Sequence, residues 1–278
     1  MMIKFNNVTF SYKSSKVLDN ISLEVGSGNI YGLLGLNGAG KSTMLYLMSG
    51  LLFAKHGQIL FNGYDMQERR PEALSDIYIV PEEFSLPNLT FDKYIKINAP
   101  FYPRFSMQML ENSLAAFDMT RDLHLGQLSM GQKKKAFMCF ALATNTRLLL
   151  MDEPSNGLDI PSKSQFRRAV AECMSDERTI IVSTHQVRDV ENLLDRIMIV
   201  DHGQVLCDKS TFEISQKLNF VQVGVGQKID NVVYMQPSTI GSVAVVKNLG
   251  DEETPLNIEL FFNAMLAERD KMTQVLKN

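Results

Sequence analysis

One stretch of nine residues constrains this chain more than any other: GLNGAGKST at positions 35–43, which fits the pattern Gly-x-x-x-x-Gly-Lys-Ser/Thr throughout. The apolar residues 30–34 before it indicate a buried strand, and the apolar spacing of residues 42–48 indicates a helix. Glycines let the backbone curl around an anion, so that successive N–H groups and the start of the helix point at it. This order favours a phosphate-binding loop, called here the phosphate loop, over a chance match.

A second stretch, LLLMDE at positions 148–153, ends an apolar run with two carboxylates. Open α/β sheets bind ligands at the carboxyl ends of their strands. We therefore expect Asp152 to hold Mg²⁺ directly or through water, and Glu153 to polarise a water that attacks the γ-phosphate. Lys41 is expected to reach the β- and γ-phosphates, and the Ser42 hydroxyl to ligate Mg²⁺. The alternative is an acidic pair that simply ends a strand.

Composition excludes several classes of protein. The chain carries 28 Lys and Arg against 31 Asp and Glu, a net charge of −3, so no overall field holds nucleic acid, and we expect none as a partner. Cys139, Cys173 and Cys207 lack metal-ligand spacing and are interpreted as buried thiols in a reducing compartment. We expect no signal peptide, and no run of about 18 uncharged apolar residues occurs. A membrane channel and a secreted disulfide scaffold are excluded.

Strand-like and helical patterns alternate along much of the chain, which predicts an α/β protein with a largely parallel sheet. Strands are expected at residues 3–10, 21–25, 30–34, 58–61, 77–80, 148–151, 179–183 and 197–200, and helices at 42–48, 163–174 and 187–194. Residues 90–128 look helical apart from Pro100 and Pro103, which predicts an inserted helical subdomain. The three lysines at 133–135 are interpreted as the solvated face of a helix that continues into apolar residues.

The pattern changes from about residue 220. Strands are expected at 221–225, 232–235 and 243–246. An amphipathic helix follows, with Thr254 as its N-cap and Pro255 at its first position. These features predict a small α+β appendage.

The sequence LSMGQ at positions 128–132, here the signature segment, lies between the two motifs above. With them it makes the chain resemble the nucleotide-binding subunit of an ATP-binding-cassette (ABC) transporter over roughly residues 2–218. The resemblance implies a P-loop NTPase fold of the ABC type, with an N-terminal antiparallel β subdomain, a mostly parallel core sheet, an inserted helical subdomain and a small C-terminal α+β appendage. We expect an ATPase domain at 1–218, with its helical subdomain at about 88–142, and an accessory domain at 219–278.

The resemblance also implies roles for individual residues. Ser129, Gly131 and Gln132 would bind the ATP held by a partner subunit, although Met130 replaces the usual glycine. Ser129 is also a good helix N-cap. The residues that would bind the chain's own ATP are Asn37, Gly38, Ala39, Gly40, Lys41, Ser42 and Thr43 of the phosphate loop.

Four positions outside these segments match the family's pattern in part. Tyr12 would stack on adenine, unless it only packs at a strand end. Asp159 would lie at a dimer interface, or cap the helix near Pro161, or both. His185 would hydrogen-bond the γ-phosphate. Glu82 stands where the family usually has glutamine, so Mg²⁺ ligation by its carboxylate is left open, and a coupling role at the permease contact is preferred.

The resemblance implies a head-to-tail dimer, of identical or different chains, that encloses two ATP molecules with Mg²⁺. ATP binding would close the dimer and drive a separate permease, with this chain peripheral on the cytoplasmic face of the membrane. The short β-containing tail favours export. A soluble ABC ATPase without a permease and a regulatory subunit that only binds nucleotide are the alternatives. Proteins of the first class carry a coiled-coil insertion or two cassettes in tandem, and this sequence shows neither. A subunit of the second class would be expected to have a damaged Glu153 or His185, and both residues are present. A small GTPase is disfavoured because no Asn-Lys-x-Asp follows the phosphate loop.

Overall fold

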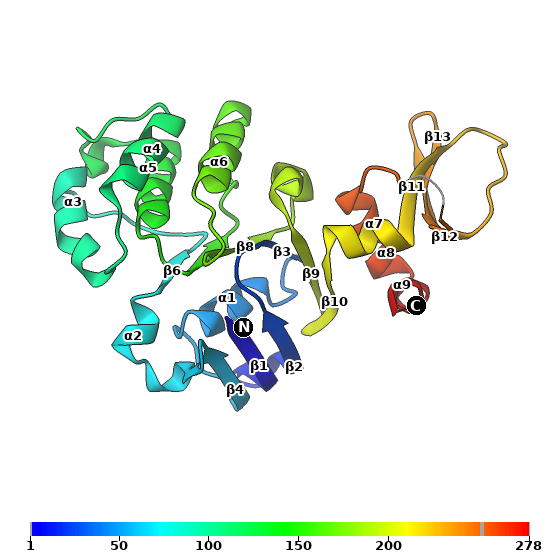
Figure 1. The fold of residues 1–278 in the computed structure, drawn as a ribbon, viewed down its shortest axis with the longest axis horizontal. Helices are drawn as coiled ribbons and strands as arrows, with labels where there is room; N and C mark the ends of the chain where they lie inside the picture. The colour runs from blue at the N-terminus through cyan, green and yellow to red at the C-terminus, as the bar shows by residue number, and fades with distance from the viewer. Residues whose placement is uncertain (1, 251–252, 278) are drawn as a thin grey trace.

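The computed structural model describes residues 2–250 and 253–277, and within these ranges it contains three β-sheets (Figure 1). The central sheet has six strands in the order β10-β9-β3-β8-β7-β6. They are β3 (Ile30–Leu34), β6 (Ile77–Val80), β7 (Leu148–Asp152), β8 (Thr179–Thr184), β9 (Arg196–Asp201) and β10 (Gln204–Ser210). All neighbours are parallel except β9 and β10, so the expected parallel core sheet is confirmed.

Each face of the central sheet carries its own apolar core. Helix α1 (Lys41–Met48) packs on one face, and α5 (Met130–Ala143) and α6 (Ile160–Glu172) pack on the other (Figure 1). Along β7, Leu150 belongs to the core with α1, whereas its neighbour Leu149 belongs to the core with α5 and α6. Burial on both faces explains why these strands read as continuous apolar runs. The three cysteines are free and buried, as expected.

An antiparallel sheet of four strands, in the order β2-β1-β4-β5, covers α1 from the other side. Its strands are β1 (Ile3–Tyr12), β2 (Ser15–Val25), β4 (His56–Phe61) and β5 (Tyr64–Asp65). This confirms the expected N-terminal β subdomain. β2 begins well before the predicted strand because register shifts between β1 and β2 interrupt the alternation of apolar and polar residues.

The helical subdomain is built from α3 (Phe91–Asn98), α4 (Met107–Ala116) and α5. Thr90 and Ser106 cap the first two helices through their hydroxyl groups, and Pro100 lies in a 3₁₀ turn after α3. The shorter helices are η1 (Met66–Glu68), α2 (Pro71–Leu74), η2 (Ala99–Phe101), η3 (Leu125–Gln127), η4 (Val187–Asp189) and η5 (Glu191–Leu193).

The helix expected at residues 187–194 is wrong: the segment forms only the two 3₁₀ turns η4 and η5. The backbone carbonyl of Asp189 accepts a hydrogen bond from the Arg167 guanidinium at 3.2 Å, and its carboxylate pairs with Lys163 at 2.7 Å. Arg167 of α6 therefore takes a backbone carbonyl that a continuing helix would use, and Lys163 holds the Asp189 side chain.

The C-terminal appendage is a three-stranded antiparallel sheet, in the order β11-β13-β12, packed against helices. Its elements are α7 (Thr211–Lys217), β11 (Leu218–Val223), β12 (Val232–Ser238), β13 (Gly241–Lys247), α8 (Ile258–Ala267) and α9 (Arg269–Lys277). Val225 lies outside β11 and is 93% exposed, so the predicted strand ends earlier.

The predicted start of the last amphipathic helix is also wrong. Asn257, not Thr254, is the N-cap of α8, and its side chain accepts the backbone N–H of Leu260 at 2.9 Å. The Thr254 hydroxyl instead accepts the backbone N–H of Phe220 at 2.6 Å, which fixes the segment to β11 before any helix begins.

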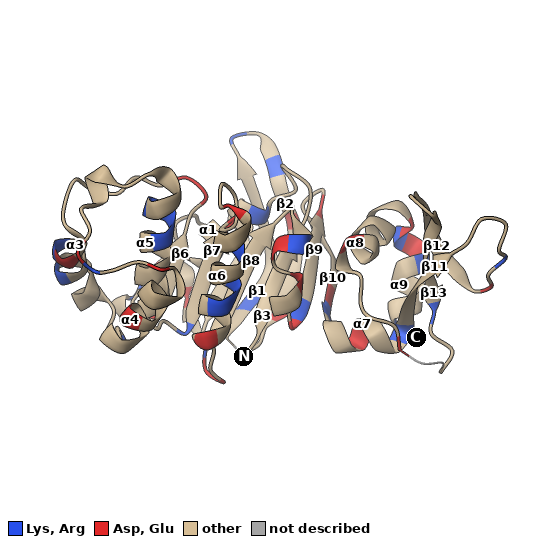
Figure 2. Cartoon of the chain, turned by 90° about the horizontal axis from the view of Figure 1, so that it is seen from above, with Lys and Arg blue, Asp and Glu red and all other residues tan. Residues whose placement is uncertain are grey.

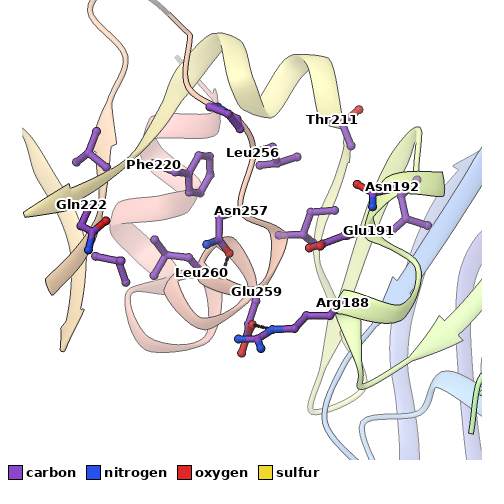
Figure 3. A pocket seen from close by; sticks show the side chains of 15 residues that line it. Arg188, Glu191, Asn192, Thr211, Phe220, Gln222, Leu256, Asn257, Glu259 and Leu260 are labelled. Atoms are coloured by element: carbon purple, nitrogen blue, oxygen red, sulfur yellow. Dashed lines mark hydrogen bonds and ion pairs between the residues drawn. The ribbon is translucent and has the colours of Figure 1, made fainter. Parts of the chain in front are cut away.

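A groove of about 710 Å³ separates the appendage from the segment that follows β8 (Figure 3). Phe220, Leu256 and Leu260 line one side of it. Arg188 of η4 pairs with Glu259 of α8 at 2.6 Å across it. The appendage is thus in direct contact with the part of the chain that precedes it. Among the described helices, none has the length and apolar character needed to cross a membrane.

Arg178, just before β8, is the largest fully buried side chain in the described ranges, with 1% of its surface exposed. Its guanidinium donates to the Cys173 carbonyl at the end of α6 at 3.3 Å and to the Ala141 carbonyl in the last turn of α5 at 3.5 Å. Carbonyls at helix C-termini lack intrahelical partners and attract positive charge. Burial nevertheless lowers the pKa of Arg178 to about 10.

Replacing Arg178 with alanine should lower the free energy of unfolding by about 3 kcal/mol, because it leaves a cavity and removes the donor to the Cys173 carbonyl. Urea denaturation followed by circular dichroism measures this. Arg70→Ala is the matched control, since Arg70 is exposed and its guanidinium contacts the Glu68 carboxylate and the Tyr64 ring at the surface, and it should cost less than about 0.5 kcal/mol. Equal midpoints for the two variants would contradict the role given to Arg178.

Candidate functional site

The phosphate loop and the predicted residues Glu82, Asp152, Glu153 and His185 lie at one edge of the central sheet, where four parallel strands end. β3 leads into the phosphate loop, β8 into His185, β7 into Glu153, and β6 into Pro81 and Glu82. The strand register aligns these ends, because Leu34 pairs with Thr184, Ser183 with Asp152, and Met151 with Val80. Segments far apart in sequence are therefore brought to one edge, as the strand order requires.

The phosphate loop curls tightly between β3 and α1. Gly40, the residue before α1, has φ = +107°, and a Cβ there would approach the Leu18 side chain to 2.9 Å. A Cβ on Gly35 would meet the Val200 carbonyl at 2.5 Å. Only glycine fits both positions. The Lys41 ammonium lies within the curl, where it donates to the Gly35 carbonyl at 2.8 Å and the Leu36 carbonyl at 3.3 Å.

Glu153 stands at the centre of the charged groups. Its Oε1 lies 2.8 Å from Nδ1 of His185 and 3.6 Å from the Lys41 ammonium. Its Oε2 is buried and accepts no hydrogen bond in the described structure. The residue is 4% exposed, yet its φ of +46° lies in the left-handed region that non-glycine residues rarely adopt. A buried carboxylate oxygen without a partner can accept a hydrogen bond from a ligand or a water molecule.

Asp152 is 1% exposed, and its carboxylate accepts a hydrogen bond from the Ser183 hydroxyl. The same hydroxyl accepts the backbone N–H of Glu153 at 3.1 Å, so β8 holds both carboxylates in place.

These groups open into a cavity of about 420 Å³, a size suited to a small ligand. Its lining residues are Tyr12, Val17, Asn37, Gly38, Gly40, Lys41, Ser42, Thr43, Glu82, Glu153 and His185. Tyr12, at the end of β1, is 47% exposed, and its ring packs edge-on against Phe10 with centroids 4.9 Å apart. A polar, basic end and an exposed aromatic rim suit a nucleotide better than an apolar ligand.

The residues present also fit Mg²⁺. No cluster of three or more His, Cys, Asp or Glu side chains in the described ranges could enclose a metal by itself. Mg²⁺ does not need such a cluster, because it is usually held by one or two protein oxygens together with phosphates and water. Ser42 and Glu82 line the cavity, and Asp152 is the carboxylate behind it.

The signature segment and Asp159 do not line this cavity. Ser129 caps α5 in a capping box, in which the Gln132 side chain accepts the Ser129 N–H at 3.1 Å. The start of this helix is exposed, and Met130 has 66% of its surface in solvent. Asp159 caps α6 by accepting the Ser162 N–H at 2.9 Å, which confirms its expected capping role. Ala39 is buried in the core beside α1.

The interpretation of residues 133–135 as a solvated face is wrong for Lys134. Basic residues do gather on the first turns of α5 (Figure 2). Lys134, however, is only 7% exposed, and its ammonium donates to the Glu153 carbonyl at 3.0 Å and the Asn156 carbonyl at 2.8 Å. Sequence reasoning missed it because three adjacent lysines resemble a surface. The available signal was the helical spacing, which directs one of three consecutive residues inward.

Comparison with known proteins agrees with this geometry. A family model described as ABC transporter matches residues 18–156. The chain belongs to the ABC transporter family. The resemblance drawn from the sequence and the expected fold are therefore confirmed.

The similarity to individual relatives extends beyond residues 18–156, which the family model matches. Nod factor export ATP-binding protein I of Cupriavidus metallidurans is 29% identical over 277 residues, which cover 98% of this chain and 83% of that protein. Bacitracin transport ATP-binding protein BcrA of Bacillus licheniformis is 31% identical over 222 residues, or 78% of this chain and 72% of that protein. A solved ATP-binding subunit of an ABC transporter superposes with a TM-score of 0.68 at 26% identity, covering 76% of this chain and 90% of that one.

The exposed ring of Tyr12 makes a direct test of nucleotide binding in this ABC domain. Tyr12→Ala should weaken ATP binding about tenfold, because base–aromatic stacking contributes ~1–3 kcal/mol. Tyr12→Phe keeps the ring and is expected to bind like the wild type. Titration with a fluorescent ATP analogue measures both, and unchanged affinity in the alanine variant would place the base elsewhere.

Proposed function

We propose that this chain is the ATP-hydrolysing subunit of an ABC transporter. The observation that carries the proposal is the Glu153 carboxylate, which lies between Lys41 and His185 with one oxygen unpartnered in a cavity of nucleotide size. A carboxylate with a free, buried oxygen suits a general base that orients a water for attack on a phosphate.

The other roles follow from where each group stands. Asn37, Gly38, Ala39, Gly40 and Thr43 belong to the loop and helix start whose N–H groups suit the phosphates. Lys41, which contacts loop carbonyls in this structure, would turn toward the β- and γ-phosphates. His185 would donate to the γ-phosphate while its other ring nitrogen contacts Glu153. Because these contacts strengthen as charge builds on the transferred phosphoryl group, they favour the transition state.

Mg²⁺ would be held by Ser42 and Asp152, with Glu82 as a further candidate, and when bound it neutralises phosphate charge. The Ser183 hydroxyl keeps Asp152 oriented for this. We also propose that Glu82 links the site to the permease contact, as a residue in a loop that leaves the sheet edge toward the helical subdomain.

We propose further that the working unit is a dimer. Ser129, Gly131 and Gln132 stand at an exposed helix N-terminus that does not face the chain's own cavity. Such an N-terminus favours an anion. A second chain, placed head to tail, would bring its nucleotide there, with Asp159 at the interface. Hydrolysis would then reopen the dimer.

The permease is proposed to be a separate chain, because the relatives are named as ATP-binding proteins of transporters. The direction of transport is proposed to be export. The names of both relatives support a transporter role, since one is a Nod factor export protein and the other a bacitracin transport protein. The similarity to the first includes the appendage. The chain would then act on the cytoplasmic face of the membrane.

Glu153→Gln tests the proposed hydrolysis most directly. It should keep ATP affinity and reduce turnover at least about 100-fold, because the amide cannot accept a proton from water. ATP-bound dimers should then accumulate and appear in size-exclusion chromatography with Mg-ATP. Glu172→Gln, a surface substitution at the end of α6, serves as the control and should match the wild type. Hydrolysis by Glu153→Gln at the wild-type rate would refute the general-base assignment.

A nucleotide site shared between two chains can be tested separately by mixing two inactive variants. Lys41→Ala should lose its own nucleotide site, and Ser129→Arg should block the site of its partner. A mixed dimer retains one site with an intact phosphate loop and an intact signature segment. If the two sites act independently, equal mixing should restore about a quarter of wild-type hydrolysis. Phosphate release measures it, and a mixture as inactive as its components contradicts the shared site.

A further inference from the structure

The backbone at Glu153 needs external support. Its left-handed φ of +46° is unusual for a residue with a side chain, and such conformations cost about 1–3 kcal/mol. On one side, the Glu153 N–H is held by the Ser183 carbonyl and hydroxyl, both at 3.1 Å. On the other side, the Glu153 carbonyl accepts the Lys134 ammonium at 3.0 Å. The direction of the carboxylate therefore depends on contacts from two different elements.

Lys134 reaches this carbonyl from the second turn of α5. The same ammonium donates to the Asn156 carbonyl at 2.8 Å, so it bridges both ends of the turn that leaves β7. The turn then continues toward Asp159 and α6. One buried cation thus joins the helix that begins with the signature segment to the backbone of the hydrolytic carboxylate.

Burying a charge in this position costs free energy, because the charge loses its contact with water. Desolvation lowers the pKa of Lys134, and the negative charges of Glu82, Glu153 and Asp152 oppose that effect. Glu82 is also tied to the same turn, because its carboxylate accepts the Asn156 side-chain amide at 3.1 Å. Two residues further along the chain, the Phe84 ring packs on Phe137 of α5 with centroids 4.7 Å apart. The loop after β6 and the signature helix are therefore packed together around this turn.

We propose that Lys134 is a positioning residue for hydrolysis: its two carbonyl contacts transmit the placement of the signature helix to Glu153, with Glu82 as the opposing charge. This inference rests on the proposed function, because it assigns a role in the same reaction. A partner's nucleotide that fixes the start of α5 would, through Lys134, fix the direction of the carboxylate in this chain's own site. Lys134 itself touches no substrate.

Lys134→Met removes the donors and the charge but keeps much of the side-chain length. In the full chain with Mg-ATP, kcat should fall about tenfold or more, because small displacements of a catalytic group have large effects on rate. The dissociation constant for a non-hydrolysable ATP analogue should change less than about threefold, since Lys134 does not line the nucleotide cavity. Thermal melting reports whether each variant is folded.

Two variants at the same helix turn serve as controls. Lys134→Arg keeps the charge and can donate to both carbonyls, so turnover should return to within about threefold of the wild type. Lys133→Met alters a neighbouring lysine that makes no side-chain hydrogen bond or ion pair within the described ranges, and it should leave kcat unchanged. If methionine prevents folding, Lys134→Gln carries the same test, because it retains one donor group without the charge and should lose turnover.

The opposing charge is tested by a double-mutant cycle with Glu82→Gln. Since the network is already broken without Lys134, the double variant should lose no more turnover than Lys134→Met alone. Loss equal to the product of the single effects would show that Glu82 acts separately. Turnover by folded Lys134→Met at the wild-type level, or a change in affinity in place of kcat, overturns the positioning role. Failure of the wild-type chain to hydrolyse ATP would instead refute the proposed function.

Discussion

The register of four parallel strands is the constraint on which this molecule depends. β3, β8, β7 and β6 are buried on both faces, so each strand is fixed by two cores at once. Shifting β7 by one residue would exchange Leu149 and Leu150 between the core of α1 and the core of α5 and α6. The same shift would move Asp152 away from Ser183. Packing of apolar side chains therefore fixes where the charged groups stand.

This constraint explains how much of the site could be predicted from sequence. The phosphate loop and the pair Asp152 and Glu153 directly follow short apolar runs, so an expected strand also places the residues after it. For the phosphate loop and the two carboxylates, the prediction needed only the rule that ligands bind at the carboxyl ends of parallel strands. Tyr12, His185 and Glu82 were predicted from the resemblance to the family, and Tyr12 ends a strand of the antiparallel sheet. The geometry agrees with that rule for the cavity residues that follow β3, β6, β7 and β8, whereas Tyr12 and Val17 come from the antiparallel sheet.

The failures share a different cause, since each depended on a contact between distant segments. Thr254 has the chemistry of an N-cap, but its hydroxyl is used by Phe220 of β11, and Asn257 caps α8 three residues later. Residues 187–194 have helical spacing, but Arg167 of α6 takes the Asp189 carbonyl. Lys134 lies in a run of three lysines, and only the placement of α5 against the turn after β7 turns it inward. The pattern of neighbouring residues in the sequence cannot predict which distant side chain takes a given backbone group.

The charge balance of the site connects these observations. Glu82 places a carboxylate where the family usually carries an amide, which adds negative charge to a cavity that already contains Glu153 and is backed by Asp152. Lys41 and His185 face the cavity, but both are proposed to bind phosphate. Lys134 supplies a positive charge from behind, within hydrogen-bonding distance of the backbone rather than of the nucleotide. Because it is buried, water and salt screen it little. The negative charge of Glu82 and the buried positive charge of Lys134 therefore partly offset each other.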